Sequence, residues 1–205
     1  ASDKVSLMTP VVKSLFSDLG MEITSDAMQI FGGYGYTKDQ GIEQLYRDNR
    51  ITPIYEGTNS VQAADLVFRK LSNKNGNIIN KFLELIKSEI NSNNEKIRPF
   101  TEEFNNYLDI LKKFSDWTVE RAKINKDDVS AAANDYLKTL GYISIAFAWI
   151  KTLQVSFKDY EENKKFYDDK ICTAKFYFEK VLPRAEQHYK SAISGSSNIM
   201  NFNFN

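Results

Sequence analysis

The segment that decides this fold is Arg47-Asp48-Asn49-Arg50-Ile51-Thr52-Pro53-Ile54-Tyr55-Glu56-Gly57-Thr58-Asn59-Ser60, which places a carboxylate between an aromatic residue and a glycine, just before a predicted helix. Gly57 has no side chain, so a ligand can approach the backbone closely there. Either Thr58 or Asn59 can cap the helix, which we expect from about residue 60 to residue 71. This is the setting of a binding or catalytic site centred on Glu56.

Two interpretations of Glu56 stay open on the residues alone. A surface carboxylate near a helix start is the ordinary case, because the helix dipole favours negative charge there. Alternatively, Pro53, Ile54 and Tyr55 remove water from the carboxylate and raise its pKa towards that of a general base. The dipole and the desolvation act in opposite directions, so the sequence does not give the net shift. Pro53 also favours an extended Thr52, which predicts a stretched peptide before Glu56.

The residues before this segment predict one long helix and one short helix. Apolar residues recur at helical spacing over residues 2–31, with the amphipathic pattern Val5, Met8, Val12, Leu15, Leu19 and Ile23. The glycine-rich stretch 32–41 should end that helix, and a short helix is expected over about 42–48. On spacing alone, Gly32-Gly33-Tyr34-Gly35 is more simply a helix-ending turn than a phosphate loop, since no strand precedes it.

The residues after the segment predict an all-α fold. Four further helical stripes begin at about Ile79, Phe104, Ala133 and Ile171, and short polar connections between them indicate an antiparallel bundle. Turn-forming residues at 72–77 suggest two domains, a helical bundle over 1–72 and a second helical bundle over 77–193. Pro183 should bend or break the last helix. The tail, 194–205, has low complexity and is expected to lie loose on the surface.

Composition excludes several classes of function. Lys plus Arg and Asp plus Glu number 27 each without clustering, so neither nucleic acid nor an anionic membrane is expected as a partner. One cysteine, Cys172, and one histidine, His188, argue against a disulfide, a metal site or a histidine triad, and both are expected at the core or its boundary. Any general base must then be a carboxylate.

Residues 140–150 are the most apolar run, but they are too short to span a bilayer and indicate the buried middle of a helix. No transmembrane segment or secretory signal is expected, and we predict a cytoplasmic protein. The abrupt start suggests a chain cut from something larger. Arg47 and Arg50 flank Asp48 and are expected to form ion pairs with it.

Three motifs occur in order along the first 71 residues. They are Gln29-Ile30-Phe31-Gly32-Gly33-Tyr34-Gly35-Tyr36, then Leu45-Tyr46-Arg47-Asp48, then Ile54-Tyr55-Glu56-Gly57-Thr58-Asn59. Together they resemble the C-terminal helical domain of acyl-CoA dehydrogenases. The remainder, about 77–193, resembles in layout the additional C-terminal domain of a long bacterial subgroup of the methylthiopropanoyl-CoA dehydrogenase type. The N-terminal and middle domains of that family are absent from this sequence.

The resemblance implies a flavoenzyme that oxidises an acyl-CoA thioester to its 2,3-enoyl form. Glu56 matches the catalytic base, and Tyr55 and Gly57 adjoin the substrate. The residues that match FAD contacts are Gln29, Ile30, Phe31, Gly32, Gly33, Thr58 and Ser60, although many members of the family have glutamine where Ser60 stands.

The resemblance also implies partners and a state of assembly. FAD is the cofactor, an electron-transfer flavoprotein is the expected acceptor, and a homo-oligomer is expected, with 31–36 buried against a partner subunit. Without that partner, Tyr34 and Tyr36 should be exposed or should drive self-association. Alone, the 205 residues are expected to be inactive. The alternative is a non-catalytic helical assembly module that pairs with another chain.

Overall fold

The computed structural model describes residues 2–90 and 94–203, and these ranges contain helices and turns but no strand. In chain order the helical elements are α1 (Ser2–Phe31), α2 (Gly33–Tyr36), η1 (Lys38–Gln40), α3 (Ile42–Asn49), α4 (Asn59–Ala64), η2 (Asp65–Leu71), η3 (Ser72–Lys74), α5 (Asn77–Glu89), α6 (Arg98–Ile124), α7 (Lys126–Lys158), η4 (Tyr160–Glu162), α8 (Lys164–Phe176), η5 (Tyr177–Val181), α9 (Arg184–Ala192) and α10 (Ser197–Met200). The predicted all-α class is confirmed.

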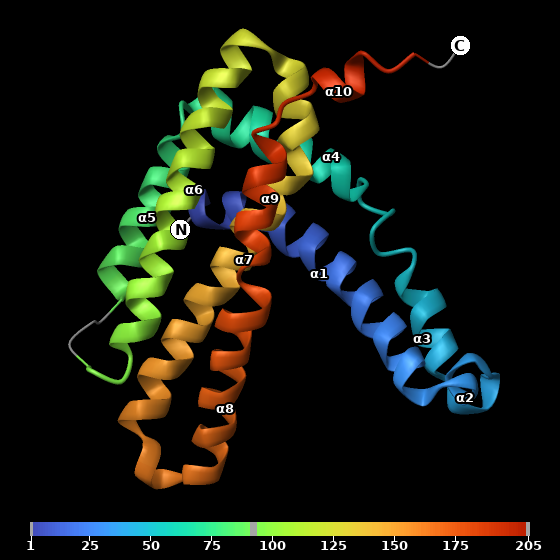
Figure 1. The fold of residues 1–205 in the computed structure, drawn as a ribbon, viewed down its shortest axis with the longest axis vertical. Coiled ribbons are helices and arrows are strands. Elements are labelled where there is room, and N and C mark those ends of the chain that lie inside the picture. Colours follow the sequence, from blue (N-terminus) through green and yellow to red (C-terminus); the bar gives the residue numbers. More distant parts are fainter. Residues whose placement is uncertain (1, 91–93, 204–205) are drawn as a thin grey trace.

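The elements form a bundle with an arm (Figure 1). The helices α5, α6, α7 and the α8–α9 pair run up and down beside one another, as the four stripes predicted. The C-terminal half of α1, together with α2 and α3, extends away from this bundle and is called the arm below. The last stripe is interrupted, as Pro183 predicted, because a π-helical turn, η5, ends the first part and α9 begins directly after Pro183.

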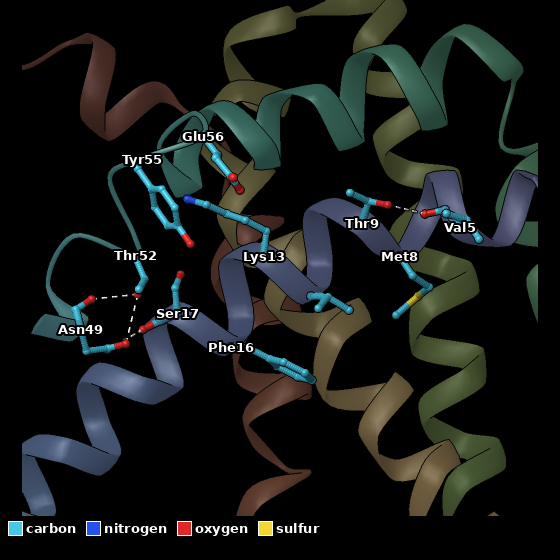
Figure 2. Close-up of a pocket in the computed structure, with 11 residues that line it drawn as sticks. Val5, Met8, Thr9, Lys13, Phe16, Ser17, Asn49, Thr52, Tyr55 and Glu56 are labelled. Carbon is cyan, nitrogen blue, oxygen red and sulfur yellow. Dashed lines mark hydrogen bonds between the residues drawn. The ribbon is translucent and has the colours of Figure 1, made fainter. Parts of the chain in front are cut away.

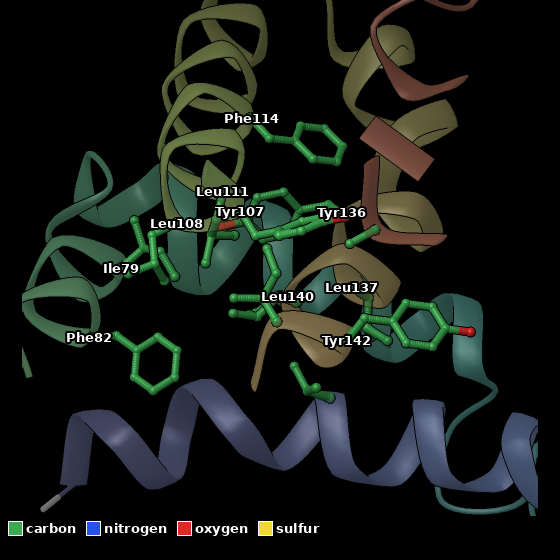
Figure 3. Close-up of a cluster of buried hydrophobic side chains, with 14 of the residues drawn as sticks. Ile79, Phe82, Tyr107, Leu108, Leu111, Phe114, Tyr136, Leu137, Leu140 and Tyr142 are labelled. Carbon is green, nitrogen blue, oxygen red and sulfur yellow. The ribbon is translucent and has the colours of Figure 1, made fainter. Parts of the chain in front are cut away.

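Large side chains from three helices fill the centre of the bundle above α1 (Figure 3). Phe104 and Phe114 from α6 and Tyr136 from α7 are fully buried. The phenol of Tyr136 has a partner there, since its oxygen lies 2.8 Å from the Ser115 hydroxyl. Burial raises the pKa of this phenol, so it stays neutral and acts as a hydrogen-bonding group within the core.

The N-terminal half of α1 belongs to the same core. Leu7, Val11 and Leu15 are buried with the bundle residues in one cluster that crosses the turn at 72–76. Gly141 of α7 permits this approach, because a Cβ atom there would lie 2.5 Å from Leu15 and 3.2 Å from Val11. The division into two domains at 72–77 stays a prediction, and the buried cluster connects its two sides.

By length and composition, α7 is the helix among the described residues that could cross a membrane. Its apolar residues Leu140, Ile143 and Ile150 have no exposed surface, and α7 packs against α1, α4, α6, α8 and α9. The prediction that 140–150 is the buried middle of a helix is therefore confirmed.

Two expectations for the C-terminal part are wrong. The tail does not begin loose, because the backbone N–H and the hydroxyl of Ser196 donate to Asp128 Oδ1 at 2.8 and 2.7 Å, and Ser196 is buried. Residues 204 and 205 of the tail lie outside the described residues. Cys172 is exposed on α8 rather than at the core, whereas His188 is half-buried at the boundary, 2.7 Å from Asp135.

Candidate functional site

Residues 50–58 connect α3 to α4 by tight turns rather than by the extended peptide that Pro53 predicted. The N–H groups of Ile54 and Tyr55 both donate to the carbonyl of Ile51 at 3.0 Å, and Asn59 N–H donates back to Pro53 O at 3.2 Å. These local hydrogen bonds outweigh the preference of a residue before proline for extended backbone. The consequence is a compact loop that presents Glu56 at its outer end.

Glu56 has left-handed backbone, with φ 57°, and Gly57 follows at φ 81°. Glycine adopts this conformation freely, but a glutamate there is unusual and costs free energy, so the surroundings must hold it. Two side chains do so. Gln62 Nε2 donates to Glu56 O at 2.9 Å and Lys13 Nζ donates to Gly57 O at 2.8 Å.

Asn59 connects the loop to α1. Its Nδ2 lies 2.9 Å from Ser17 Oγ and 2.6 Å from Asp18 Oδ1, and its Oδ1 accepts from Lys13 Nζ at 2.8 Å. Thr58 caps α4, as predicted, because its hydroxyl oxygen accepts from Val61 N–H at 3.4 Å. The start of α4 and the middle of α1 are thereby fixed relative to each other.

A groove of about 710 Å³ runs along α1 beside this loop (Figure 2). Its apolar wall comes from one face of α1 and its polar end from the loop, and it is lined by Val5, Met8, Thr9, Val12, Lys13, Phe16, Ser17, Asn49, Thr52, Tyr55 and Glu56. Figure 2 shows Lys13 extending from α1 towards the turn that carries Tyr55 and Glu56. The site thus combines a carboxylate, a cation and an apolar surface.

The residues of the amphipathic pattern predicted for α1 do not form a single buried face. Val5, Val12 and Ile23 are 66%, 44% and 64% exposed, whereas Leu7, Val11 and Leu15 are buried. The helix has two apolar faces, and the predicted pattern mixed residues of both. One face packs on the bundle, and the other is open.

The expected desolvation of Glu56 is not supplied by its neighbours along the chain. Ile54 and Tyr55 are 46% and 49% exposed, and Glu56 itself is exposed. Each of these side chains would need an additional surface over the groove to be shielded from water. In the structure, the Glu56 carboxylate is therefore open to solvent.

The glycine motif lies at the far end of the arm, apart from Glu56. A separate hollow there is lined by Ser25, Met28, Gln29, Gly32, Gly33 and Tyr36. Along α1, Lys13 and Gln29 are separated by about 24 Å at the rise of an α-helix. The structure brings Tyr55 and Glu56 together in the groove, with Gly57 following in the loop, and leaves Gln29, Ile30, Phe31, Gly32 and Gly33 at the tip.

The surface of the tip is apolar and open. Ile30, Tyr34 and Tyr36 are 84%, 74% and 79% exposed, and Phe31 is also exposed, so the predicted exposure of Tyr34 and Tyr36 is confirmed. Gly32, at φ 60°, ends α1 as the glycines predicted, although the stretch that follows still forms α2 and η1.

The ion pair predicted for Arg47 is wrong, and Ser60 has a hydrogen-bond partner that was not predicted. Arg47 pairs with Glu43 one turn earlier, at 2.7 Å, instead of with Asp48, because residues four apart face each other on a helix and adjacent ones do not. Ser60 lies at the start of α4, where its hydroxyl oxygen accepts from Asn134 Nδ2 at 3.3 Å. Within 2–90 and 94–203, no three metal-binding side chains gather at one place.

Sequence reasoning missed Lys13 and Gln62. A signal for Lys13 was available, since a lysine interrupts the apolar run of α1 near its middle. For Gln62 no sequence signal existed, because a glutamine in the first turns of a helix is ordinary. The left-handed backbone at Glu56 also had no signal, since glutamate has no preference for it.

Two family models match the chain. The family model described as acyl-CoA dehydrogenase, C-terminal domain, matches residues 2–71, and the one described as acetyl-CoA dehydrogenase C-terminal like matches 78–203, more than half of the chain. The chain belongs to the acyl-CoA dehydrogenase family. Both matched models describe C-terminal regions of this family, as the motifs and the layout of the helices predicted.

Relatives in this family are much longer than the chain. The 3-methylmercaptopropionyl-CoA dehydrogenase of Ruegeria pomeroyi is 40% identical over 86 residues, which cover 42% of this chain and 15% of that protein. The butyryl-CoA dehydrogenase of Syntrophomonas wolfei is 27% identical over 194 residues, or 89% of this chain and 31% of that protein. The chain therefore spans about a third or less of the curated relatives that it matches.

Two solved structures share the fold. The Caenorhabditis elegans ACDH-11 in complex with C11-CoA aligns with a TM-score of 0.70 and 22% identity, covering 99% of this chain and 34% of that one. An acyl-CoA dehydrogenase complexed with FAD from Bacillus anthracis aligns with a TM-score of 0.70 and 18% identity, covering 92% and 32%. At these identities the likeness concerns the fold of the helices.

Proposed function

We propose that this chain contributes the proton-abstracting carboxylate, Glu56, to an FAD-dependent acyl-CoA dehydrogenase that converts an acyl-CoA thioester to the 2,3-enoyl-CoA. The observation that carries the proposal is the placement of Glu56. It stands at the polar end of an apolar groove, on backbone that is held in an unusual conformation by Gln62 and Lys13. Such costly local geometry is typical of functional sites.

The chemistry requires a base beside the carbon that is alpha to the thioester carbonyl. The Glu56 carboxylate takes the alpha proton and becomes a carboxylic acid, while the electron pair of that C–H bond forms the new double bond. FAD, when bound, accepts the hydride that leaves the beta carbon. A carboxylate is suited to the first step when it is held within hydrogen-bond reach of the carbon and shielded from water.

The groove is suited to an acyl group lying along α1. Val5, Val12 and Phe16 present exposed apolar surface, which binding of a hydrocarbon chain would remove from water. Tyr55 lies beside Glu56 at the polar end, and Gly57 leaves the backbone open to the thioester. Chain-length preference depends on the surface that closes the groove.

The tip of the arm is suited to the edge of a dinucleotide. A Cβ atom at Gly32 or Gly33 would meet no atom within 4 Å, so this backbone is uncovered, and Gln29 beside it offers an amide. Ile30 and Phe31 add exposed apolar surface. We propose that these five residues contact the adenosine diphosphate part of FAD.

Thr58 and Ser60 are the proposed contacts nearer to Glu56. Each hydroxyl accepts one hydrogen bond, from Val61 N–H and from Asn134 respectively, and both residues are exposed. Each therefore keeps its proton for donation to the cofactor.

The distance between tip and groove supports an assembly of subunits. Because the tip lies about 24 Å along α1 from Lys13, we propose that it contacts the FAD of a neighbouring subunit in a homo-oligomer. The exposed side chains of Tyr34 and Tyr36 would then be buried against that neighbour. An electron-transfer flavoprotein is the proposed acceptor of the electrons.

Replacing Glu56 by glutamine in the holoenzyme tests the function. Glu56→Gln keeps the size and polarity of the side chain but removes the base, so acyl-CoA should no longer bleach the flavin absorbance, while FAD content stays at the wild-type level. Glu84→Gln on α5, an exposed glutamate outside the groove, is the matched control and should bleach normally. Bleaching by the Glu56→Gln variant at the control rate would reject the proposal.

The second candidate is a non-catalytic assembly module, which the apolar surface of the arm favours. Ile23, Ile30, Tyr34 and Leu45 are all more than half exposed, as in a surface that pairs with another chain. This function predicts a colourless purified protein that takes up no flavin and forms a stable oligomer in sedimentation. A yellow protein that oxidises butanoyl-CoA with an artificial acceptor would exclude it.

A further inference from the structure

We infer that Lys13 is a positioning residue for Glu56, which it holds at the groove by fixing the backbone of the loop. The inference rests on the proposed function of Glu56 and assigns a role to a residue of α1. Lys13 does not act on the substrate in this scheme. It acts through Gly57 and Asn59.

Lys13 connects two points of the loop to α1. Its half-buried side chain donates from Nζ to Gly57 O and to Asn59 Oδ1, both at 2.8 Å, across 44 and 46 residues of sequence. Among the described residues, no carboxylate oxygen lies within ion-pair distance of this ammonium group. The ammonium group therefore donates its hydrogen bonds to neutral acceptors of the loop.

The hydrogen bonds to the carbonyl groups of residues 56 and 57 depend on the backbone conformation of Glu56. Lys13 fixes the carbonyl of Gly57, and Gln62 fixes the carbonyl of Glu56 at 2.9 Å. A return of Glu56 from φ 57° to ordinary negative φ would turn the peptide groups and break these bonds. The two donors come from α1 and α4, so the conformation of Glu56 depends on the contact between these helices.

The side chain of Asn59 is itself held by hydrogen bonds to α1. Asn59, which shares the ammonium group with Gly57, also bonds to Ser17 and Asp18 one turn further along α1. Lys13 lies on the groove face of α1, so the same helix that forms the apolar wall sets the position of the carboxylate. A misplacement of a reacting group by about 1 Å can reduce a rate about 100-fold, which makes such fixing consequential.

The test compares three variants of the holoenzyme. Lys13→Met removes the donor and keeps the length of the side chain, Lys13→Arg restores a donor, and Lys4→Met is a control at an exposed lysine of the same helix. With Lys13→Met we expect flavin reduction by saturating acyl-CoA to slow about 10-fold to 100-fold, with FAD content unchanged. The isotope effect with acyl-CoA deuterated at the alpha carbon should rise, and Lys13→Arg should recover part of the rate.

A second measurement does not depend on activity. The amides of Tyr55 and Asn59 are hydrogen-bonded within the loop, at 3.0 and 3.2 Å, and should exchange their hydrogens faster in Lys13→Met than in Lys4→Met. Gln62→Leu, which frees the other carbonyl, should produce the same two changes. This second variant keeps the test valid if Lys13→Met folds poorly.

Three results would overturn the inference. They are an unchanged reduction rate in Lys13→Met, a slower rate with an unchanged isotope effect, and a rate that falls only in proportion to lost FAD. If Glu56→Gln abolishes bleaching but Lys13→Met reduces flavin normally, the positioning role fails while the proposed function stands. If Glu56→Gln bleaches normally, the proposed function fails first.

Discussion

The bundle and the site segment are stabilised by different interactions. In the bundle, Phe104, Phe114 and Tyr136 have no exposed surface and pack in one apolar cluster, where the Tyr136 phenol lies 2.8 Å from the Ser115 hydroxyl. Around Glu56, in contrast, side-chain hydrogen bonds from Lys13 and Gln62 hold the backbone, and one from Asn59 joins the loop to Asp18 of α1, while apolar side chains remain open. The difference indicates that the core shared by the bundle and the N-terminal half of α1 is closed to solvent, whereas the apolar side chains around Glu56 are open.

The largest change in the free energy of unfolding should come from a substitution in the bundle. Phe114→Ala removes a fully buried ring that contacts the rings of Trp117, Tyr136 and Tyr189. We expect it to lower the free energy of unfolding by about 3–5 kcal/mol. Urea unfolding measures this loss, with Phe176→Ala as a control because Phe176 is 60% exposed. Equal losses in the two variants would contradict the description of the core.

A smaller effect is expected where hydrogen bonds replace apolar packing. Asn59→Ala leaves the groups that it joins on α1 without their partner, and we expect a loss of about 1–3 kcal/mol. Unlike the loss in the bundle, the loss of stability should be confined to the loop. Hydrogen exchange should accelerate in 51–62 while α6 and α7 keep their protection, and uniform acceleration across the chain would show that the loop and bundle unfold as one unit.

The contact between Asp128 and Ser196 of the C-terminal tail should make the free energy of unfolding depend on pH. Hydrogen bonds from the hydroxyl and backbone N–H of Ser196 lower the pKa of Asp128 below its ordinary value of 3.8. A lowered pKa stabilises the folded protein above that value, and the contribution is lost as pH falls through the folded pKa. Asp128→Asn should therefore cost about 1 kcal/mol near pH 7 and almost nothing well below pH 3.

Urea unfolding at both pH values tests this prediction. A difference between wild type and variant that stays constant from pH 7 to acid would show that the charge of Asp128 is not the cause. Ser130→Ala is a suitable control, because its hydroxyl donates only to a carbonyl of its own helix, that of Lys126, at 3.0 Å.

The smallest effect on folding should come from the tip of the arm. Tyr34 is 74% exposed, so Tyr34→Ser should change the free energy of unfolding by less than about 0.5 kcal/mol. If the tip contacts a neighbouring subunit, the same substitution should weaken the oligomer, which sedimentation of the holoenzyme measures. A large loss of monomer stability would place Tyr34 in a core instead.

The sequence predicted the helices well and the site segment poorly, for a physical reason. Helical spacing, the glycine after Phe31 and Pro183 each act locally, so the bounds of α1 and the break before α9 followed from them. The turns before Glu56 depend on hydrogen bonds made within the folded loop and from α1, and these contacts override the preference that Pro53 imposes. Local preferences could not reveal them.

The composition of α1 shows the same limit. A helix with one buried face can be recognised from its period, but Leu7 and Val5 belong to opposite faces that are both apolar. The sequence predicted the helix, but it did not predict which of its faces would be buried. In the same way it marked Glu56 by its neighbours, while the donors Lys13 and Gln62 became evident only in three dimensions.

The unbroken length of α1 has a consequence for how sequences of this kind can vary. The helix runs from the core through the groove to the glycine tip, so it sets both the spacing and the relative orientation of the two places. One residue inserted between Asp18 and Met28 would turn the tip by about 100° around the helix axis and move it by about 1.5 Å. A change in the length of that stretch would therefore misalign the two ends of the molecule.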